Sequence, residues 1–309
     1  MNLESIMSQA PPSSRVDSGT PNAGNIDETS RLPRICAVGD NVIDQYPGRG
    51  VQYPGGNAVN VAVHAARSGA LASYVGRVGS DAAGQQILEA LETEGVDCTR
   101  LLVVPGETAR VTIELCGGER DFRDWTLGVS TFTLDEADLR HLAQFDLVHT
   151  GEASGLDEQM ETVSRVVPVS YDFSDRDLNS VRHVLPYVSI AFFSRSSESL
   201  AEIHQFVDEI LASGPEIVVV TRGAAGSIAR SRGQAFIDQP VEEIEVIDTL
   251  GAGDSYIAAF LSTLLTTDDV SRAALSGARH AANTCTFIGA FGDQYAQELA
   301  AHVPSKVPN

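Results

Sequence analysis

Short apolar runs that alternate with helix-length amphipathic segments constrain the fold of this chain most. In its second half, residues 145–149, 166–171, 189–193 and 216–220 have the apolar composition of buried strands. Between the last two runs, residues 199–212 place their apolar side chains on one face of a predicted helix. This alternation predicts an α/β fold, in which helices cover both faces of a mostly parallel sheet through right-handed crossovers.

The first half of the chain continues this pattern as far as residue 94. Residues 34–39 and 72–76 are expected to be buried strands, and residues 81–94 a helix. Another helix is expected over residues 58–66, with Asn57 as its cap and a glycine at position 69 as its stop.

Residues 109–125 depart from the pattern. Apolar and polar residues alternate there on both sides of Gly117-Gly118, which is typical of a β-hairpin with one polar face. We therefore expect a small antiparallel β-element inserted into the α/β fold.

The two ends of the chain lack periodic patterns. Residues 1–33 are rich in Ser, Pro, Asn and Gly and are expected to form a disordered tail. One domain is expected over residues 34–300, followed by a short tail over residues 301–309. The N-terminus lacks the apolar core of a secretory signal, and no apolar run approaches the roughly 18 residues that span a bilayer. The 4 cysteines are scattered, which suits a reducing compartment, so a cytoplasmic location is expected.

Residues 248–254, with the sequence Asp-Thr-Leu-Gly-Ala-Gly-Asp, are the most informative short segment. Its glycines let the backbone turn so that successive N–H groups point into one hollow. The apolar run 256–261 predicts a helix directly after this turn, and a helix N-terminus adds positive potential. The segment is therefore expected to bind an anion.

Asp254, at the end of that segment, is expected to take a proton from a hydroxyl that attacks a phosphoryl group. This interpretation predicts a phosphotransferase that acts on an alcohol. We expect a low pKa for Asp254, because the positive potential of a helix N-terminus favours the carboxylate. The alternative role of Asp254 is to cap the helix.

Composition excludes several classes of enzyme. The only lysine is Lys306, so the chain lacks the lysine of a P-loop, of a protein kinase and of Schiff-base chemistry. No G-x-G-x-x-G follows the first strand, which argues against a Rossmann dehydrogenase. The net charge of −21 opposes binding to nucleic acid or anionic membranes. A nucleotide site would therefore need backbone N–H groups, arginines and a divalent cation.

Two further motifs precede the 248–254 segment. They are Gly55-Gly56-Asn57 with Asn60, and Gly76-x-x-Gly79-x-Asp81. With these motifs in this order, the chain resembles the ribokinase-like (PfkB) carbohydrate kinase family over about residues 34–295. Residues 39–47, 55–63 and 172–175 are most similar to the fructoselysine 6-kinase branch.

The resemblance implies a ribokinase-like fold, a doubly covered and mostly parallel sheet with a small β-sheet lid at about residues 45–56 and 106–128. It also implies an ATP-dependent kinase that transfers the γ-phosphoryl group to a primary hydroxyl of a ketose or ketosamine. A fructoselysine-like compound is the first expected substrate. Asp254 would be the base, and Gly251, Ala252 and Gly253 would form the anion hole.

On the sugar side, the resemblance implies residues whose carboxylates and amides suit vicinal hydroxyls, together with two glycines. The expected residues are Asp40, Asp44, Gly55, Gly56, Asn57, Asn60 and Glu152. The alternative for Asn57 and Asn60 is a helix cap and a surface amide. On the hairpin, Arg110, Arg123 and Asp124 would meet the amino-acid part of a substrate, and the alternative there is a solvated edge.

On the nucleotide side, Thr221, Gly223 and Gly226 resemble the family's loop near the ATP phosphates, although the alternative is an ordinary turn between strands. Arg176, in Asp172-x-Ser174-x-Arg176, is expected to reach a phosphate. The family's N-x-x-E element is altered here, and Glu198 stands in its place as the candidate that organises Mg²⁺ through water. The resemblance also allows a K⁺ site near Asp248.

Other functions remain open at this stage. Within the same family, the alternatives are a fructokinase, a ribokinase or a nucleoside kinase. Outside catalysis, the alternative is a sugar or nucleotide sensor that kept the fold, which the altered N-x-x-E element favours. The expected partners are ATP and a small sugar, and a homodimer would form through the lid.

Overall fold

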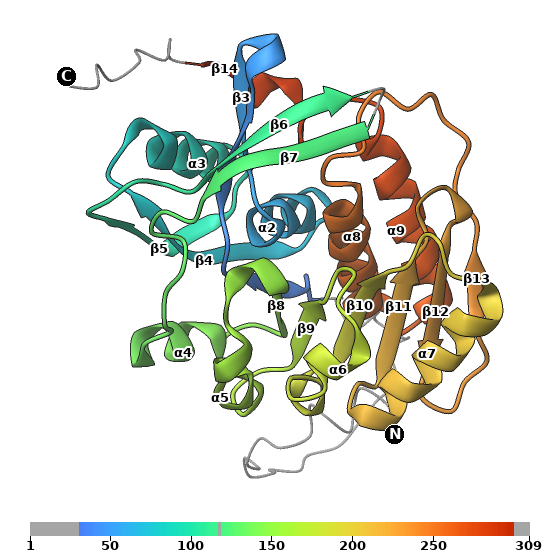
Figure 1. The fold of residues 1–309 in the computed structure, drawn as a ribbon. Coiled ribbons are helices and arrows are strands. Elements are labelled where there is room, and N and C mark those ends of the chain that lie inside the picture. Colours follow the sequence, from blue (N-terminus) through green and yellow to red (C-terminus); the bar gives the residue numbers. More distant parts are fainter. Residues whose placement is uncertain (1–30, 117–118, 300–309) are drawn as a thin grey trace, which may run out of the picture.

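The computed structural model describes residues 31–116 and 119–299, which form two β-sheets and the helices around them (Figure 1). Side chains are described for these residues except at positions 115–122. The tail predicted over residues 1–33 lies outside the described residues as far as residue 30, and the tail predicted over 301–309 lies wholly outside them.

The larger sheet has the strand order β13-β12-β11-β10-β9-β8-β1-β4-β5. Its strands are β1 (Arg34–Val38), β4 (Leu71–Gly79), β5 (Asp97–Val104), β8 (Leu147–Gly151), β9 (Val169–Asp172), β10 (Ile190–Ser194), β11 (Ile217–Thr221), β12 (Ser227–Ser231) and β13 (Ile237–Gln239). Neighbouring strands are parallel except where β12 pairs with β11 and β13. The mostly parallel sheet predicted from the apolar runs is therefore confirmed.

Helices cover both faces of this sheet (Figure 1). Their bounds are α2 (Asn57–Arg67), α3 (Ala82–Thr93), α4 (Glu136–Leu142), α5 (Met160–Ser164), α6 (Leu178–Val181), α7 (Leu200–Ser213), α8 (Ala252–Thr267) and α9 (Val270–Thr284). Along β1, Ile35 and Ala37 pack into the core beneath α2 and α8, whereas Cys36 and Val38 pack into the core on the opposite face. Burial on both faces explains why the predicted strands have continuous apolar runs.

Three strands of the larger sheet have no counterpart in the sequence prediction, namely β5, β12 and β13. In β5, buried and exposed positions are mixed, because this strand lies at one edge of the sheet. At the other edge, β13 has only 3 residues. Edge strands that bury one face lack the continuous apolar run that marks a central strand, so the pattern did not reveal β5 and β13. Strand β12 lies inside the sheet, between β11 and β13.

The smaller sheet has the strand order β14-β3-β2-β6-β7. Its strands are β2 (Val42–Tyr46), β3 (Val51–Gly55), β6 (Arg110–Cys116), β7 (Glu119–Thr126) and β14 (Gln297–Glu298). Strands β6 and β7 form the predicted antiparallel hairpin. The strands β2, β3, β6 and β7 are called the lid below. Because β2 follows β1 after three residues, the lid starts at the carboxyl end of a central strand.

Within the part of the chain that the structure describes, no helix is both long enough and apolar enough to cross a membrane.

Candidate active site

The first turn of α8 positions Asp254. Gly251 precedes the helix with φ 73°, and a Cβ atom there would lie 2.7 Å from the carbonyl oxygen of Ala290. Glycine is therefore required both by the backbone conformation and by the close approach of another segment. Gly253 differs, since a Cβ atom there would meet no atom within 4 Å. The N–H groups of this first turn carry the positive end of the helix dipole, and that of Ala252 also donates to the Thr249 carbonyl oxygen at 3.3 Å.

Two amide side chains of α2 hold the Asp254 carboxylate. Asn57 Nδ2 donates to Asp254 Oδ1 at 2.8 Å, and Asn60 Nδ2 donates to Asp254 Oδ2 at 2.7 Å. The two asparagines are three positions apart, so they lie on one face of the helix. The two main motifs of the sequence, almost 200 positions apart, meet at this carboxylate.

The prediction that Asn57 caps α2 is wrong. The helix begins with Asn57 itself. The N-cap position is therefore occupied by Gly56, which has no side chain that could cap the helix. The cap comes instead from Asp40, whose carboxylate accepts from the N–H groups of Asn57 at 2.8 Å and Ala58 at 3.3 Å. Asp40 thus has a structural role that the sequence analysis did not assign, and the amide of Asn57 is left for the site.

Asp44, Gly55 and Asn60 converge beside Asp254. A Cβ atom at Gly55 would lie 2.3 Å from Asp44 Oδ2 and 3.9 Å from Asn60 Oδ1. Asp44 is buried on β2. Among the described residues, no group donates a hydrogen bond to the buried Oδ1 of Asn60. The group therefore offers carboxylate and amide acceptors that suit sugar hydroxyls.

A second carboxylate, Asp172 at the end of β9, adjoins Asp254. Asn57 Nδ2 also donates to Asp172 Oδ2 at 2.9 Å, so one NH₂ group bridges the two carboxylates. Burial, with repulsion from Asp254, raises the pKa of Asp172 to about 7. Asp172 belonged to a recognised motif but was not predicted as a site residue. Its position, at the carboxyl end of a parallel strand, was the available signal.

The predicted low pKa of Asp254 is wrong. Burial raises the pKa of Asp254 to about 6, and the negative charge of Asp40 also raises it. The hydrogen bonds from Asn60 and Asn57 act in the opposite direction but do not prevent this rise. In this site the loss of water outweighs the helix N-terminus.

His149 is a buried neighbour that the sequence analysis missed. It lies on β8, where its ring nitrogens are 3.0 Å from Ser170 Oγ and 3.2 Å from Asn57 Oδ1. Burial lowers the pKa of His149 to about 3, so the ring is neutral. His149 is the last residue of the predicted strand 145–149, and a histidine at that position was the available sign of a polar role.

Glu152 follows β8 and lies near the carboxylate pair. Burial raises the pKa of Glu152, and the charge of Glu152 in turn raises that of Asp172. Arg176 is 4.0 Å from Glu152 but forms a shorter ion pair, 2.9 Å, with Asp157. The guanidinium predicted to reach a phosphate is thus held by Asp157 in this structure.

A cavity of about 520 Å³ lies on the other side of the α8 N-terminus. Thr221, Gly223 and Gly226 line it together with Ala252 and Gly253. The structure therefore brings the predicted phosphate loop to one cavity with Ala252 and Gly253 of the predicted anion hole, whereas Gly251 does not line it. Gly226 has φ 87°, and a Cβ atom there would lie 2.2 Å from the carbonyl oxygen of the facing strand β13.

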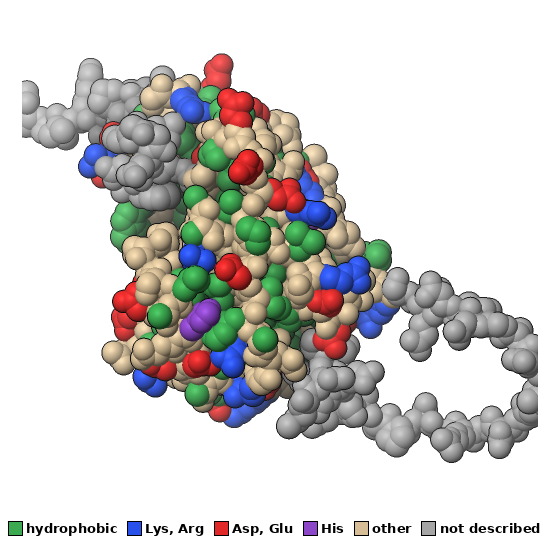
Figure 2. Space-filling view, turned by 90° about the vertical axis from the view of Figure 1, so that its right-hand side faces the viewer, with side chains coloured by type: hydrophobic (Ala, Val, Ile, Leu, Met, Phe, Trp, Pro, Cys, Tyr) green, Lys and Arg blue, Asp and Glu red, His purple; other side chains and the backbone are tan. Residues whose placement is uncertain are grey.

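Sequence reasoning missed most of the wall of this cavity. Small side chains of α9 form one part, and the segment 241–246 forms another with Val241, Ile244 and Val246. These apolar side chains are exposed at the surface. Figure 2 shows the side of the molecule near β13 and α7, where apolar side chains lie among acidic and basic ones. The alanines of α9 that line the cavity are Ala278, Ala281 and Ala282. An alanine stripe has the same pattern as a helix–helix contact, so it did not indicate a ligand.

Glu198, which follows β10, stays a predicted organiser of Mg²⁺ through water. Its carboxylate is 3.1 Å from Arg195 Nε, and Glu198 does not line the cavity. No cluster of three or more His, Cys, Asp or Glu residues in the described ranges has the geometry to hold a metal ion. The carboxylate of Asp248 accepts from the N–H groups of Leu250 at 3.1 Å and Gly289 at 3.2 Å. Two backbone N–H groups therefore orient the Asp248 carboxylate.

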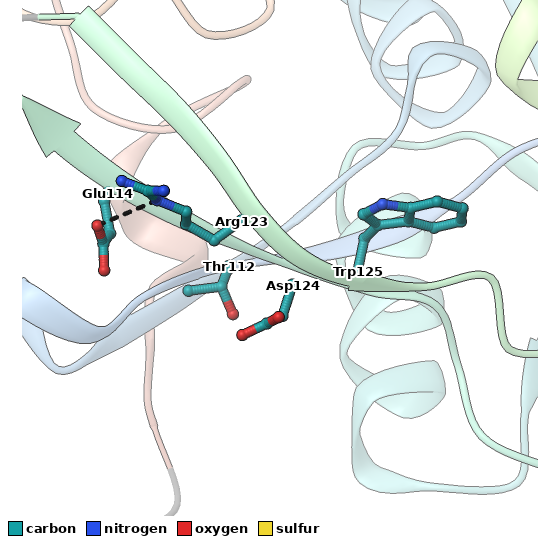
Figure 3. Close-up of a pocket in the computed structure, with 5 residues that line it drawn as sticks. All are labelled: Thr112, Glu114, Arg123, Asp124 and Trp125. Carbon is teal, nitrogen blue, oxygen red and sulfur yellow. Dashed lines mark ion pairs between the residues drawn. The ribbon is translucent and has the colours of Figure 1, made fainter.

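The lid hairpin carries the side chains that were expected to meet a substrate. Arg110 forms an ion pair of 2.7 Å with Asp81, at the start of α3. Arg123 forms one of 3.3 Å with Glu114 on the neighbouring strand, and Figure 3 shows this pair beside a shallow hollow. Trp125 lines the same hollow and is 66% exposed. Arg110 and Arg123 are thus engaged with acidic side chains of the chain itself.

Comparison with known proteins gives consistent matches. The protein-family model described as pfkB family carbohydrate kinase matches residues 26–294. The chain is 39% identical over 272 residues to fructosamine kinase FrlD of Bacillus subtilis, covering 86% of this chain and 95% of that protein. It is 36% identical over 265 residues to fructoselysine 6-kinase of Escherichia coli, covering 84% and 100%. The fold is similar, with a TM-score of 0.75 and 21% identity, to Arabidopsis thaliana ribokinase complexed with ribose and ATP, covering 85% and 97%.

Proposed function

The chain belongs to the pfkB family of carbohydrate kinases and has a ribokinase-like fold, and on this premise we propose that it transfers the γ-phosphoryl group of ATP to a primary hydroxyl of a ketosamine. The carbohydrate kinase class follows from the family. The substrate, the donor and the roles of individual residues are the proposal.

The observation that carries the proposal is the position of two consecutive residues. Gly253 lines the cavity that contains the predicted phosphate loop, whereas Asp254 faces Asn57 and Asn60. A phosphate at the N–H groups of the first turn of α8 would therefore lie next to a hydroxyl held at Asp254. This arrangement supports direct transfer between the two sides of the turn.

In the proposed reaction, the acceptor hydroxyl oxygen forms a bond to the γ-phosphorus, and the bond from that phosphorus to the β–γ bridging oxygen breaks. The electron pair of the broken bond stays with ADP, and the hydroxyl proton passes to the Asp254 carboxylate. A base whose pKa is about 6 is largely ionised at pH 7 to 8 and accepts a proton better than an ordinary aspartate. The backbone N–H groups of Gly251 to Gly253 would stabilise the charge on the phosphoryl oxygens.

Two observations support a ketosamine over a plain ketose. The relatives named above are a fructosamine kinase and a fructoselysine 6-kinase, at 39% and 36% identity. In addition, the acceptor side gathers carboxylates with few opposing charges. Asp40 raises the pKa of Asp254, and Asp254, Glu152 and Asp40 raise that of Asp172. Such surroundings favour a substrate with a protonated amine.

Mg²⁺ is expected to arrive with ATP, held by phosphate oxygens and water, because it commonly keeps several waters and few protein ligands. When bound, it would offset part of the triphosphate charge. The K⁺ site near Asp248 stays a prediction.

We also propose that two copies pair through the lid. The support is the outer surface of the hairpin, where Trp125 is exposed beside the Arg123–Glu114 pair. Sedimentation of the protein and of Trp125→Glu tests this, since a dimer that dissociates in the variant is expected and a monomer in both would contradict it.

The substrate is tested by measuring ADP release with fructoselysine, fructose, ribose and a nucleoside under identical conditions. We expect the highest kcat/KM with fructoselysine. A higher value with fructose or ribose would replace the ketosamine by that sugar. Absence of turnover with all of them, despite binding of ATP, would favour a sensor.

A further inference from the structure

We propose that His149 is a positioning residue for the catalytic base, acting through the amide of Asn57. The proposal rests on the proposed role of Asp254. His149 is buried in the central strand β8 and belongs to none of the sequence motifs, so the sequence does not indicate this role. It is carried by the hydrogen bonds that connect β9, β8, α2 and α8.

The first step concerns the orientation of the Asn57 amide. One of its terminal atoms lies within hydrogen-bond distance of both Asp172 Oδ2 and Asp254 Oδ1. Asp254 is largely ionised at pH 7 to 8 and then only accepts hydrogen bonds, so the atom that faces it is the NH₂ group, which has two protons to donate. The amide oxygen, Oδ1, is then the atom that faces His149.

The second step fixes the tautomer of His149. Because Asn57 Oδ1 is an acceptor, the histidine nitrogen 3.2 Å away, Nε2, must carry the proton. The other nitrogen, Nδ1, is then an acceptor and receives the O–H of Ser170 at 3.0 Å. The ring stays neutral because burial disfavours its charged form. Ser170 thus orients His149, and His149 orients Asn57.

The third step is the confinement of the amide. A Cβ atom at Gly151 would lie only 2.6 Å from Asn57 Oδ1, so the strand after His149 also encloses the amide oxygen. His149 and Ser170 are both fully buried. Without the donor on His149, the amide can rotate and turn its oxygen toward Asp172 and Asp254, where the two negative groups would repel it.

The consequence concerns the base itself. The charged groups that act on Asp254 and Asp172 are these two carboxylates, Asp40 and Glu152. All are negative, and the donors that oppose their repulsion are the NH₂ groups of Asn57 and Asn60, together with the Ser174 N–H on Asp172. Loss of the oriented Asn57 donor is therefore expected to raise the pKa of the carboxylate pair and to displace Asp254 from the acceptor hydroxyl.

The first test compares His149→Leu with His149→Gln, since glutamine keeps an N–H donor and leucine does not. For H149L we expect kcat to fall roughly 10–100-fold with KM for ATP unchanged, as for a misplaced base. The acid limb of its kcat–pH profile should move upward by about one unit. H149Q should recover most of both values. Equal profiles for wild type and H149L, or equal losses in H149L and H149Q at equal thermal stability, would overturn the proposal.

The second test needs no variant and no substrate. In protein with ¹⁵N-labelled histidine, we expect the His149 shifts of a neutral ring with Nε2 protonated and Nδ1 unprotonated, unchanged between pH 5 and pH 8. A ring that carries its proton on Nδ1, or that titrates in this range, would contradict the proposed orientation. Because this measurement is independent of turnover, failure of the kinase assignment and failure of the positioning role can be told apart.

Discussion

On the α2 side of the α8 N-terminus, Asp254 lies among amides and carboxylates that bond one another, whereas on the opposite side Ala252 and Gly253 line a cavity with mostly small and aliphatic walls. The first side fixes atoms through hydrogen bonds between side chains. The cavity side would select a ligand by its shape, since most of the contacts there would come from backbone groups and methyl groups. The side chains around Asp254 therefore determine the chemistry at the acceptor hydroxyl, and the shape of the cavity determines which phosphoryl donor fits.

The strongest test of this division is Asp254→Asn, which keeps the shape of the side chain and removes the base. We expect kcat to fall about 10²–10⁴-fold, the usual contribution of a general base. Binding of ATP, measured by calorimetry, should change little, because the carboxylate faces α2. The matched control is Asp268→Asn at the exposed opposite end of the same helix, which should leave both values unchanged.

Gly253→Ala probes the cavity side at the same helix turn. A methyl group there meets no atom of the chain, so the thermal stability should stay equal or rise slightly. It would, however, occupy the space expected for the phosphoryl group, and we expect kcat/KM for ATP to fall roughly 10–100-fold. Gly251→Ala is the contrast, since its positive φ and the contact with Ala290 predict a lower unfolding temperature. Unchanged kcat/KM in G253A would remove the anion hole from this turn.

Ala281→Leu tests the aliphatic wall without touching the chemistry. Overpacking of a fitted cavity costs about 1–3 kcal/mol, so we expect KM for ATP to rise roughly 5–150-fold. The KM for the sugar should stay the same. Ser271→Leu, on an exposed position of the same helix, is the control. A rise in the sugar KM alone would place the acceptor, not the donor, in this cavity.

The smallest expected effect is a shift in pH dependence. The carboxylate pair should titrate with apparent pKa values near 6 and 7, so kcat should fall as the pH drops through this range. Asp172→Asn removes a negative neighbour and should lower the pKa of Asp254, which moves the acid limb downward by about one unit or less. An acid limb that moves upward would contradict the coupling of the pair.

The same pKa values bear on stability. Asp172 titrates near pH 4 when unfolded but near pH 7 when folded, so the unfolded state binds fewer protons between these values. The free energy of unfolding should therefore decrease as the pH rises from 4 to 7. In D172N this decrease should be smaller, as urea titrations at several pH values would show.

What the sequence could predict follows the same division. The strands that are buried on both faces and the 248–254 turn each have a pattern contained in a short stretch of sequence, and both were predicted. The roles of Asp40 and Asn57 were partly exchanged, because either side chain can cap a helix and only tertiary contact decides which one does. The raised pKa of Asp254 could not be foreseen, since it depends on burial beside residues distant in the chain.

The cavity wall was the least predictable part. Alanines on a helix pack equally well against another helix or beside a ligand, and the segment 241–246 has no periodic pattern. His149 was missed for a related reason, because one histidine in an apolar strand gives no indication of what its two nitrogens meet.

The central claim, that donor and acceptor meet at the first turn of α8, is tested most directly by a crystal structure with fructoselysine and a non-hydrolysable ATP analogue. The account predicts the acceptor hydroxyl oxygen within hydrogen-bond distance of Asp254, and the terminal phosphate at the N–H groups of residues 251–253. A terminal phosphate bound away from this turn, or a sugar whose hydroxyls all lie beyond the reach of Asp254, would contradict it.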